Sequence, residues 1–171
     1  MDLHLPRRRG ATRLERVLAL VLFAGFVGIF LDRMAFYQEY AEKTAMELTA
    51  ANIRAGMRSR VAELILANRA DEIARMADDN PINFLDKLPY NYVGEFDGAP
   101  PGLLAGKWYY DRQNRELVYG VNNQRHFASL AGANPVVRFQ TTRVSAESGN
   151  SQNVRNVWVK FVPKDEYRWQ P

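Results

Sequence analysis

The sequence predicts an α+β fold in which an N-terminal transmembrane helix continues into a long amphipathic helix packed on a small antiparallel β-sheet. Three patterns indicate this fold: an uncharged apolar run near the N-terminus, a helical stripe of apolar residues after it, and a β-rich C-terminal part. The expected parts are a basic leader (1–10), a transmembrane helix (11–37), an extramembrane helix (38–80), a packed loop (81–106) and a sheet region (107–171).

The transmembrane helix is predicted from residues 17–31, which read VLALVLFAGFVGIFL and contain no charged side chain. At about 1.5 Å per residue this run spans about 22 Å, and apolar residues on both flanks extend it toward the roughly 30 Å of a bilayer core. A core helix of a soluble protein usually keeps a polar face, whereas this run has none. We therefore expect the segment to cross a membrane.

The orientation of this helix follows from the arginines around it. Five arginines lie before the apolar run, whereas the charges that follow it are of mixed sign. Because positive flanks stay in the cytoplasm, we expect a cytoplasmic N-terminus and a C-terminal domain across the membrane. A cleaved signal peptide would need a pair of small residues after the run, but LDRMAFYQEY follows, so an uncleaved anchor is favoured. The five arginines are Arg7, Arg8, Arg9, Arg13 and Arg16.

The composition argues against nucleic-acid binding and against catalysis. The net charge is +4, but residues 1–33 contribute +3 of it, so the body of the chain lacks the basic cluster that a nucleic acid requires. There is no cysteine, the two histidines are His4 and His126, and no phosphate loop or nucleophile motif occurs. We therefore expect no enzyme, no cofactor and no metal centre.

A calcium site is an alternative that the sequence leaves open. Acidic and amide side chains that could ligate calcium stand together at Asp78, Asp79 and Asn80. The same trio, followed by Pro81, is also typical of a helix end, and that interpretation is favoured. Further carboxylates of the following loop are Asp86, Glu95 and Asp97.

The extramembrane helix is predicted from apolar positions that recur every three or four residues on one helical face. We expect one helix, or two helices with a joint near Asn68, ending at Asp78. On its solvent side, Glu39 is expected to pair with Lys43. The predicted apolar stripe consists of Met46, Ala50, Ile53, Met57, Val61 and Leu64, with Ile73 and Met76 beyond the joint.

The remaining residues predict a loop and a sheet. Residues 81–106 are rich in proline and glycine but also carry apolar side chains, so we expect a loop packed on the domain. In the hairpin that follows, Trp108, Tyr109 and Tyr119 are expected to pack across the strands. The predicted strand segments are Lys107–Asp111, Glu116–Val121, Val136–Val144 and Val154–Val162.

The N-terminal junction, RRRG-ATRLE at residues 7–15, resembles the processing site of type IV pilins and type II secretion pseudopilins. The shared features are a basic leader ending in Gly10 and a glutamate, Glu15, five residues later at the edge of an apolar helix. The order of elements is also similar to pilin architecture, and GKWYYDRQNRELVYGV resembles a glycine–tryptophan–aromatic–aspartate pattern of pseudopilins. The chain departs from the family at Ala11 and Arg13, where the family carries apolar residues, usually Phe or Met first.

The resemblance implies that a prepilin peptidase cuts between Gly10 and Ala11 and that Glu15 sets the register between subunits. In the family this carboxylate pairs with the N-terminal ammonium of a neighbouring subunit, because an unpaired charge beside an apolar helix is costly. It further implies a bacterial inner-membrane location, a periplasmic domain, and partners among pilin-like or assembly-platform subunits. The expected assembly residues are Val17, Leu20, Phe23, Phe26 and Phe30.

Two alternatives remain open. The first is an unprocessed inner-membrane factor of the same machinery, such as an MSHA-type pilus biogenesis protein. At the junction itself, a plain signal anchor is also open, in which Gly10 and Glu15 have this spacing by chance and Arg13 and Arg16 screen Glu15 within its own chain. The second is a membrane-tethered periplasmic ligand-binding or adaptor domain unrelated to pilins. Its expected pocket residues are Trp108, Tyr109, Tyr110 and Phe127.

Overall fold

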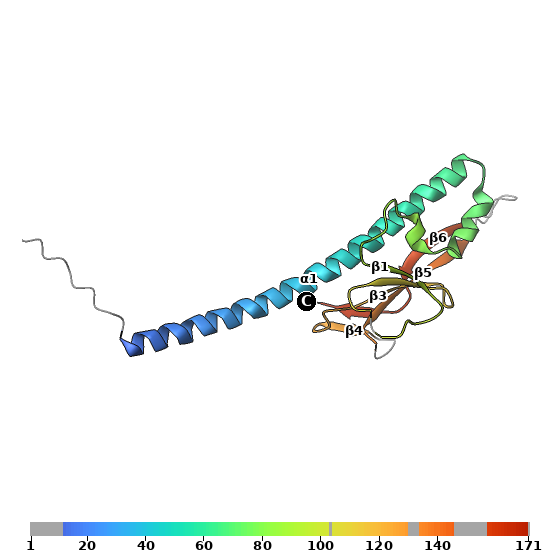
Figure 1. Ribbon diagram of the computed structural model, residues 1–171. Coiled ribbons are helices and arrows are strands. Elements are labelled where there is room, and N and C mark those ends of the chain that lie inside the picture. Colours follow the sequence, from blue (N-terminus) through green and yellow to red (C-terminus); the bar gives the residue numbers. More distant parts are fainter. Residues whose placement is uncertain (1–11, 103, 130–133, 146–156, 171) are drawn as a thin grey trace, which may run out of the picture. The chain divides into compact units, whose positions relative to one another are not determined.

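The computed structural model describes residues 12–102, 104–129, 134–145 and 157–170. The chain divides into two units, residues 1–38 and 39–171, and helix α1 (Arg13–Leu66) contributes its first part to one unit and its second part to the other. In the second unit, α1 is followed by two 3₁₀ helices and by strands (Figure 1). The α+β class is therefore confirmed, with a long apolar N-terminal helix before a sheet.

Helix α1 is 54 residues long, and its surface pattern changes along its length. Before residue 38 no side chain is buried, whereas after it a single apolar stripe is buried. Apart from Glu39, the buried residues are those of the predicted stripe, which confirms the amphipathic helix beyond the apolar run. The members of the buried stripe are Met46, Ala50, Ile53, Met57, Val61 and Leu64.

One glycine of α1 permits a close approach of the following loop. A Cβ at Gly56 would lie 1.9 Å from the carbonyl oxygen of Phe84, so any side chain here would displace the loop or the helix. Phe84 ends the second 3₁₀ helix, η2 (Pro81–Phe84), whose Pro81 and Ile82 are buried. Glycine at position 56 lowers the helix propensity of α1, but its lack of a Cβ permits η2 to pack closely against the helix.

Helix α1 ends at Leu66, and the chain turns at Asn68, whose φ of 56° lies in the left-handed region. A 3₁₀ helix, η1 (Ala70–Ala77), follows and places Ile73 and Met76 in the core. The break thus falls at the joint predicted near Asn68, but the second helix is of the 3₁₀ type.

The main sheet has five strands in the order β1-β2-β3-β5-β6. The pairs β2–β3, β3–β5 and β5–β6 are antiparallel, but β1 runs parallel to β2. The sheet is therefore mixed, and the expectation of a purely antiparallel sheet is wrong. A parallel neighbour requires a crossover, which the chain makes between β1 and β2. The strands are β1 (Tyr92–Phe96), β2 (Trp108–Asp111), β3 (Glu116–Gly120), β5 (Val136–Ser145) and β6 (Val157–Pro163), and a second sheet pairs β4 (Phe127–Ser129) with β7 (Tyr167–Trp169).

Strand β1 and helix η2 both lie in the segment 81–106, which the sequence predicts as a packed loop. The strand pattern is obscured because Gly94 adopts a φ of 109° and the pairing with β2 shifts register between Tyr92 and Glu95. Strands β2, β3 and β5 lie where the sequence predicts them. The predicted start of the last strand, Val154, lies outside the described residues.

The core lies between α1 and one face of the main sheet. Trp108 and Tyr119 are register partners on β2 and β3, with ring centroids 5.0 Å apart, so the predicted cross-strand packing of this pair is confirmed. Phe139 on β5 stacks on Phe161 on β6 with centroids 5.1 Å apart. Tyr109 alternates to the opposite face of β2, away from Trp108.

Candidate functional site

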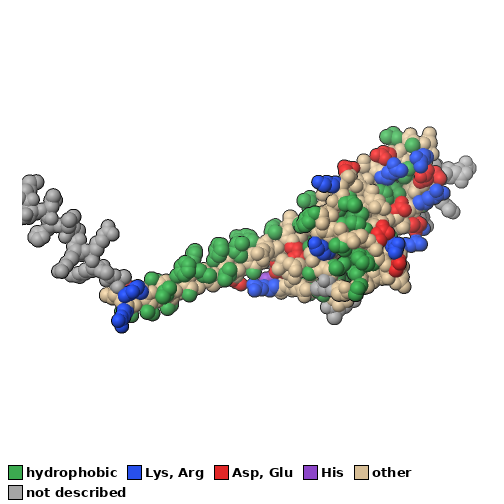
Figure 2. Space-filling view, viewed as in Figure 1, with side chains coloured by type: hydrophobic (Ala, Val, Ile, Leu, Met, Phe, Trp, Pro, Cys, Tyr) green, Lys and Arg blue, Asp and Glu red, His purple; other side chains and the backbone are tan. Residues whose placement is uncertain are grey.

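The first part of α1, residues 13–38, has an apolar surface that is exposed along its whole length (Figure 2). Only Val27 and Ala35 are partly buried, and no residue is fully buried. Within the part of the chain that the structure describes, α1 is the one helix that is long and apolar enough to cross a membrane. An apolar surface of this extent is unfavourable in water and suits a lipid environment, so the chain is compatible with membrane association.

The residues predicted to mediate assembly all belong to this exposed part. Their exposed fractions range from 55% for Phe30 to 67% for Leu20 and Phe26. Val21 and Ile29 are exposed to a similar extent, so burial does not set the predicted residues apart from their neighbours. The whole surface of this part is the candidate contact surface for lipid or for other helices.

Charged and aromatic side chains lie toward both ends of the apolar surface. Arg13 and Arg16 stand in the first turns of α1, and Arg33 follows the uncharged run. The rings of Phe36 and Tyr37 meet edge to face with centroids 5.7 Å apart. Arginine and tyrosine reach from apolar surroundings toward water, so both suit the headgroup regions of a bilayer.

Glu15 forms a capping box with Thr12 at the start of α1. The amide of Thr12 donates to Glu15 Oε2 at 2.7 Å, and the amide of Glu15 donates to Thr12 Oγ1 at 3.3 Å. This reciprocal pair satisfies two amides that the start of a helix otherwise leaves unbonded. Glu15 therefore has a hydrogen-bond partner within its own chain, and this partner is Thr12, which the sequence analysis did not predict. The predicted cleavage residues, Gly10 and Ala11, lie outside the described residues.

Glu39 is buried at the start of the second unit, with 2% of its surface exposed. Its carboxylate accepts bonds from the His126 amide at 2.9 Å and from Trp169 Nε1 at 3.0 Å, and it lies 2.8 Å from His126 Nδ1. Burial by itself raises the pKa of Glu39, but these bonds outweigh burial and hold the pKa below its ordinary value. The predicted surface pair of Glu39 with Lys43 is therefore wrong, because Glu39 faces the C-terminal strands.

Glu42 lies one turn further along α1 and binds the segment that follows β3. Its Oε1 accepts from the Asn122 amide at 2.7 Å and from the Tyr119 hydroxyl at 3.1 Å. Its Oε2 accepts from the amide and the side chain of Asn123 at 2.9 and 2.7 Å. Burial, and then the negative charge of Glu42, raise the pKa of Tyr119, which keeps the hydroxyl protonated as a donor. We call Glu39 and Glu42 together the carboxylate clamp.

One part of the carboxylate clamp, Glu39, could have been recognised from the sequence. Glu39 precedes Met46 by seven residues, about two helical turns, so it continues the buried stripe. A carboxylate on a buried face is costly unless it is hydrogen bonded, so its position alone indicates a buried acceptor. The donors could not be found in this way, because His126 and Trp169 lie 87 and 130 residues away.

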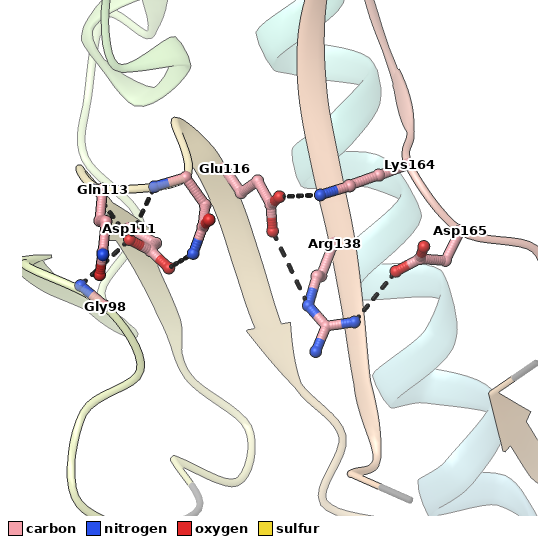
Figure 3. Close-up of polar contacts among 8 residues, drawn as sticks. Gly98, Asp111, Gln113, Glu116, Arg138, Lys164 and Asp165 are labelled. Atoms are coloured by element: carbon pink, nitrogen blue, oxygen red, sulfur yellow. Dashed lines mark hydrogen bonds and ion pairs between the residues drawn. The ribbon is translucent and has the colours of Figure 1, made fainter. Parts of the chain in front are cut away.

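Asp111 organises the turn between β2 and β3 (Figure 3). Its Oδ1 accepts from the amides of Gly98, Gln113 and Asn114 at 3.1, 2.9 and 3.1 Å. Burial raises the pKa of Asp111, but these bonds and the one from the Asn114 side chain outweigh it and lower the pKa. The carboxylate is fully engaged by the backbone around it, so its role is structural.

Glu116 is the centre of an ion network on the sheet face opposite α1 (Figure 3). It bonds the ammonium of Lys164 and lies 3.7 Å from Nε of Arg138. Arg138 in turn donates to Asp165 at 3.0 Å. The network joins β3, β5 and the residues after β6, and every charge in it is paired, which is typical of a structural network and not of a reactive site.

Two of the residues considered for calcium, Asp78 and Asn80, are engaged by protein groups. Asp78 bonds both Arg115 and Arg143. The Asn80 side chain caps η2 by accepting from the Ile82 amide at 3.1 Å, and it donates to the Tyr92 hydroxyl at 2.8 Å. Among the residues that the structure describes, no group of three or more His, Cys, Asp or Glu side chains could hold a metal ion. Asp78 follows the last residue of η1 and Asn80 caps the start of η2, so residues 78–80 connect the two 3₁₀ helices.

The four aromatic residues of the ligand-binding alternative do not share one pocket. Trp108 lines a cavity of about 590 Å³ beside α1, but Tyr109 points to the other face of β2. Phe127 packs against Trp169 with ring centroids 5.5 Å apart, in the smaller sheet. Tyr110 is buried in the core.

No protein-family model, curated protein or solved structure matches this chain. Its function therefore has to be inferred from the geometry of the described residues. Their arrangement offers an exposed apolar helix surface and a domain in which the buried carboxylates of the described residues, Glu39, Asp111 and Glu116, all accept hydrogen bonds or ion pairs from protein groups.

Proposed function

We propose that the chain is a pilin-like subunit or an inner-membrane biogenesis factor of a type IV pilus or type II secretion system, acting by helix-mediated assembly and not by catalysis. The observation that supports this proposal most is helix α1 itself. Its first part is apolar and exposed on all sides, and its second part is the core helix of a small α+β domain. Pilin-like proteins use a single helix for both tasks.

In this proposal the chain crosses the bacterial inner membrane once, with its N-terminus in the cytoplasm and its domain in the periplasm. The arginines before the apolar run support this orientation. The partners are other pilin-like or assembly-platform subunits, which contact the first part of α1. The uncharged run 17–31 within this part suits helix packing in a bilayer, where van der Waals contact replaces the hydrophobic effect.

Intact mass tests whether the chain is processed like a pilin. The chain is produced in a bacterial inner membrane with and without a prepilin peptidase, extracted, and weighed by mass spectrometry. Loss of MDLHLPRRRG together with one added methyl group is expected for a processed subunit. A full-length chain in the presence of active peptidase would contradict the subunit form of the proposal.

The capping box allows a sharper test of Glu15. A glutamine at this position keeps the capping box but removes the charge, whereas an alanine removes both. If Glu15 sets the register by pairing with an ammonium, Glu15→Gln and Glu15→Ala should both be absent from sheared filaments. Incorporation of Glu15→Gln at the wild-type level would show that only the cap matters.

The second candidate is the unprocessed biogenesis factor, and the bonded state of Glu15 is the observation that favours it. Its carboxylate already accepts from Thr12 at Oε2, so Glu15 has a role at the start of α1 that does not involve a neighbouring subunit. This candidate expects a full-length mass and normal pilus assembly with Glu15→Gln. Failure of assembly with Glu15→Gln, despite normal levels of the chain in the membrane, would contradict it.

A further inference from the structure

A groove with an apolar floor and a basic rim lies between α1 and the outer strand β6. Its volume is about 390 Å³. One wall is a helical stripe of α1 and the other is the middle of β6, the last strand in the order of the main sheet. The lining residues are Arg54, Met57, Arg58 and Val61 of α1, and Trp158, Val159, Lys160, Phe161 and Val162 of β6.

The backbone of β6 turns hydrogen-bonding groups toward this groove. The Phe161 carbonyl accepts from Arg54 Nε at 3.1 Å, so it points to α1 and away from β5. In an antiparallel ladder the N–H and C=O of one residue point to the same side, and neighbouring residues alternate. Val159 therefore also turns its N–H and C=O toward the groove. The backbone N–H and C=O of Lys160 point to β5 instead, although its side chain lines the groove. An outer strand with such groups is a template for a further strand.

The charge of the groove selects the chemistry of what can bind there. Its three charged residues are all cations, Arg54, Arg58 and Lys160, and no described acidic side chain lines it. Arg54 already lies over the Phe161 ring, 6.0 Å from its centroid, but Arg58 and Lys160 are exposed. An extended segment that brings a carboxylate would pair with these two cations.

We propose that this groove binds an extended segment of a partner protein, which adds beside β6 at Val159 and places an acidic side chain between Arg58 and Lys160. Trp158, which is 48% exposed at the rim, provides an apolar contact for the segment. Main-chain bonds supply affinity in this mode of recognition, and side-chain pockets supply specificity. The proposal does not depend on the assembly function of the apolar helix, since every residue in it belongs to the second unit.

The test uses the full chain in lipid nanodiscs and a display library of random heptapeptides. Selected peptides are expected to carry Asp or Glu flanked by apolar residues, and a synthetic copy of the best peptide is then titrated by fluorescence anisotropy. Arg58→Glu and Lys160→Glu should each weaken its binding at least tenfold. Val159→Pro, which removes an amide that faces the groove and not β5, should weaken it to a similar extent.

The matched control is Arg60→Glu, which reverses a charge on the same helix outside the groove, at an exposed residue paired with Glu63. It should change peptide affinity less than twofold, and thermal melting should show that every variant is folded. A library without enriched acidic binders, or equal losses with Arg60→Glu and Arg58→Glu, would overturn the proposal. So would self-association of the chain that the same groove variants abolish, because a second copy would then be the occupant.

Discussion

The two parts of α1 place apolar side chains on one continuous helix in opposite ways. In residues 13–38 apolar side chains occupy all sides and none is buried, whereas in residues 39–66 they form one buried stripe. The second part also buries a carboxylate, Glu39, which the first part does not do. The arrangement of apolar residues, more than their number, therefore separates a helix surface suited to lipid from one suited to a protein core.

Truncating one aliphatic side chain in each part should give the largest contrast. Ile53 is fully buried and Leu20 is 67% exposed. Ile53→Ala should destabilise the domain by about 2–5 kcal/mol, because it removes buried contacts and leaves a cavity. Leu20→Ala should change the unfolding of the domain by less than about 0.5 kcal/mol. Urea unfolding of the full chain in nanodiscs, followed by tryptophan fluorescence, measures both, and equal losses would contradict the division of α1.

Removing the buried carboxylate should have the next largest effect. Glu39→Ala leaves the buried Trp169 Nε1 without an acceptor, and we expect a loss of about 2–3 kcal/mol. The exposed Glu47, on the same part of α1, serves as the control, and Glu47→Ala should change stability by less than about 0.5 kcal/mol. A loss below about 1 kcal/mol for Glu39→Ala would show that the clamp adds little.

The charge of Glu39 should also appear in the pH dependence of stability. Its pKa is lowered in the folded state from an ordinary value of 4.5, so its contribution is present above that pH and is lost as the pH falls through the folded pKa. Chemical unfolding of the wild type and of Glu39→Gln between pH 7 and pH 3 measures this contribution. The difference between the two should shrink below pH 4.5. A constant difference would mean that the pKa of Glu39 is not lowered.

Alanine at two glycines of α1 should give a smaller contrast, with a loss of domain stability at one position and no change at the other. At Gly56 a Cβ meets the Phe84 carbonyl oxygen, whereas at Gly28 nothing lies within 4 Å. Gly56→Ala should destabilise the domain by about 1–3 kcal/mol, despite the gain of up to about 1 kcal/mol in helix propensity. Gly28→Ala should leave domain unfolding unchanged. Stabilisation by Gly56→Ala would show that η2 does not approach α1 closely.

The sequence predicted the elements whose signals are local. The buried stripe of α1 and strands β2, β3 and β5 follow from periodicity and turn residues within short windows. Strand β1 was missed because Gly94 and a register shift interrupt its alternation. The parallel pairing of β1 with β2, and the small sheet of β4 and β7, are non-local and left no pattern in either strand alone.

In the candidate site, too, features with a local sequence signal were predictable and features built from distant segments were not. The uncharged run identified the apolar surface of α1, because composition alone defines it. The capping box of Thr12 and Glu15 has a sequence signature. It was missed because the resemblance to pilins led to the interpretation of Glu15 as a contact between subunits. The carboxylate clamp needed partners from distant segments, which only the fold brings to Glu39.

The most direct test of the account is the environment of the two parts of α1 in a bilayer. The chain has no cysteine, so Phe23→Cys and Leu48→Cys give single spin-label sites at two exposed positions, one in each part. Electron paramagnetic resonance in lipid vesicles then compares collisions with oxygen, which concentrates in lipid, and with a water-soluble nickel chelate. The label at residue 23 should collide with oxygen and be protected from nickel, and the label at residue 48 should do the reverse. Equal access of nickel to both labels would contradict a membrane-embedded first part of α1.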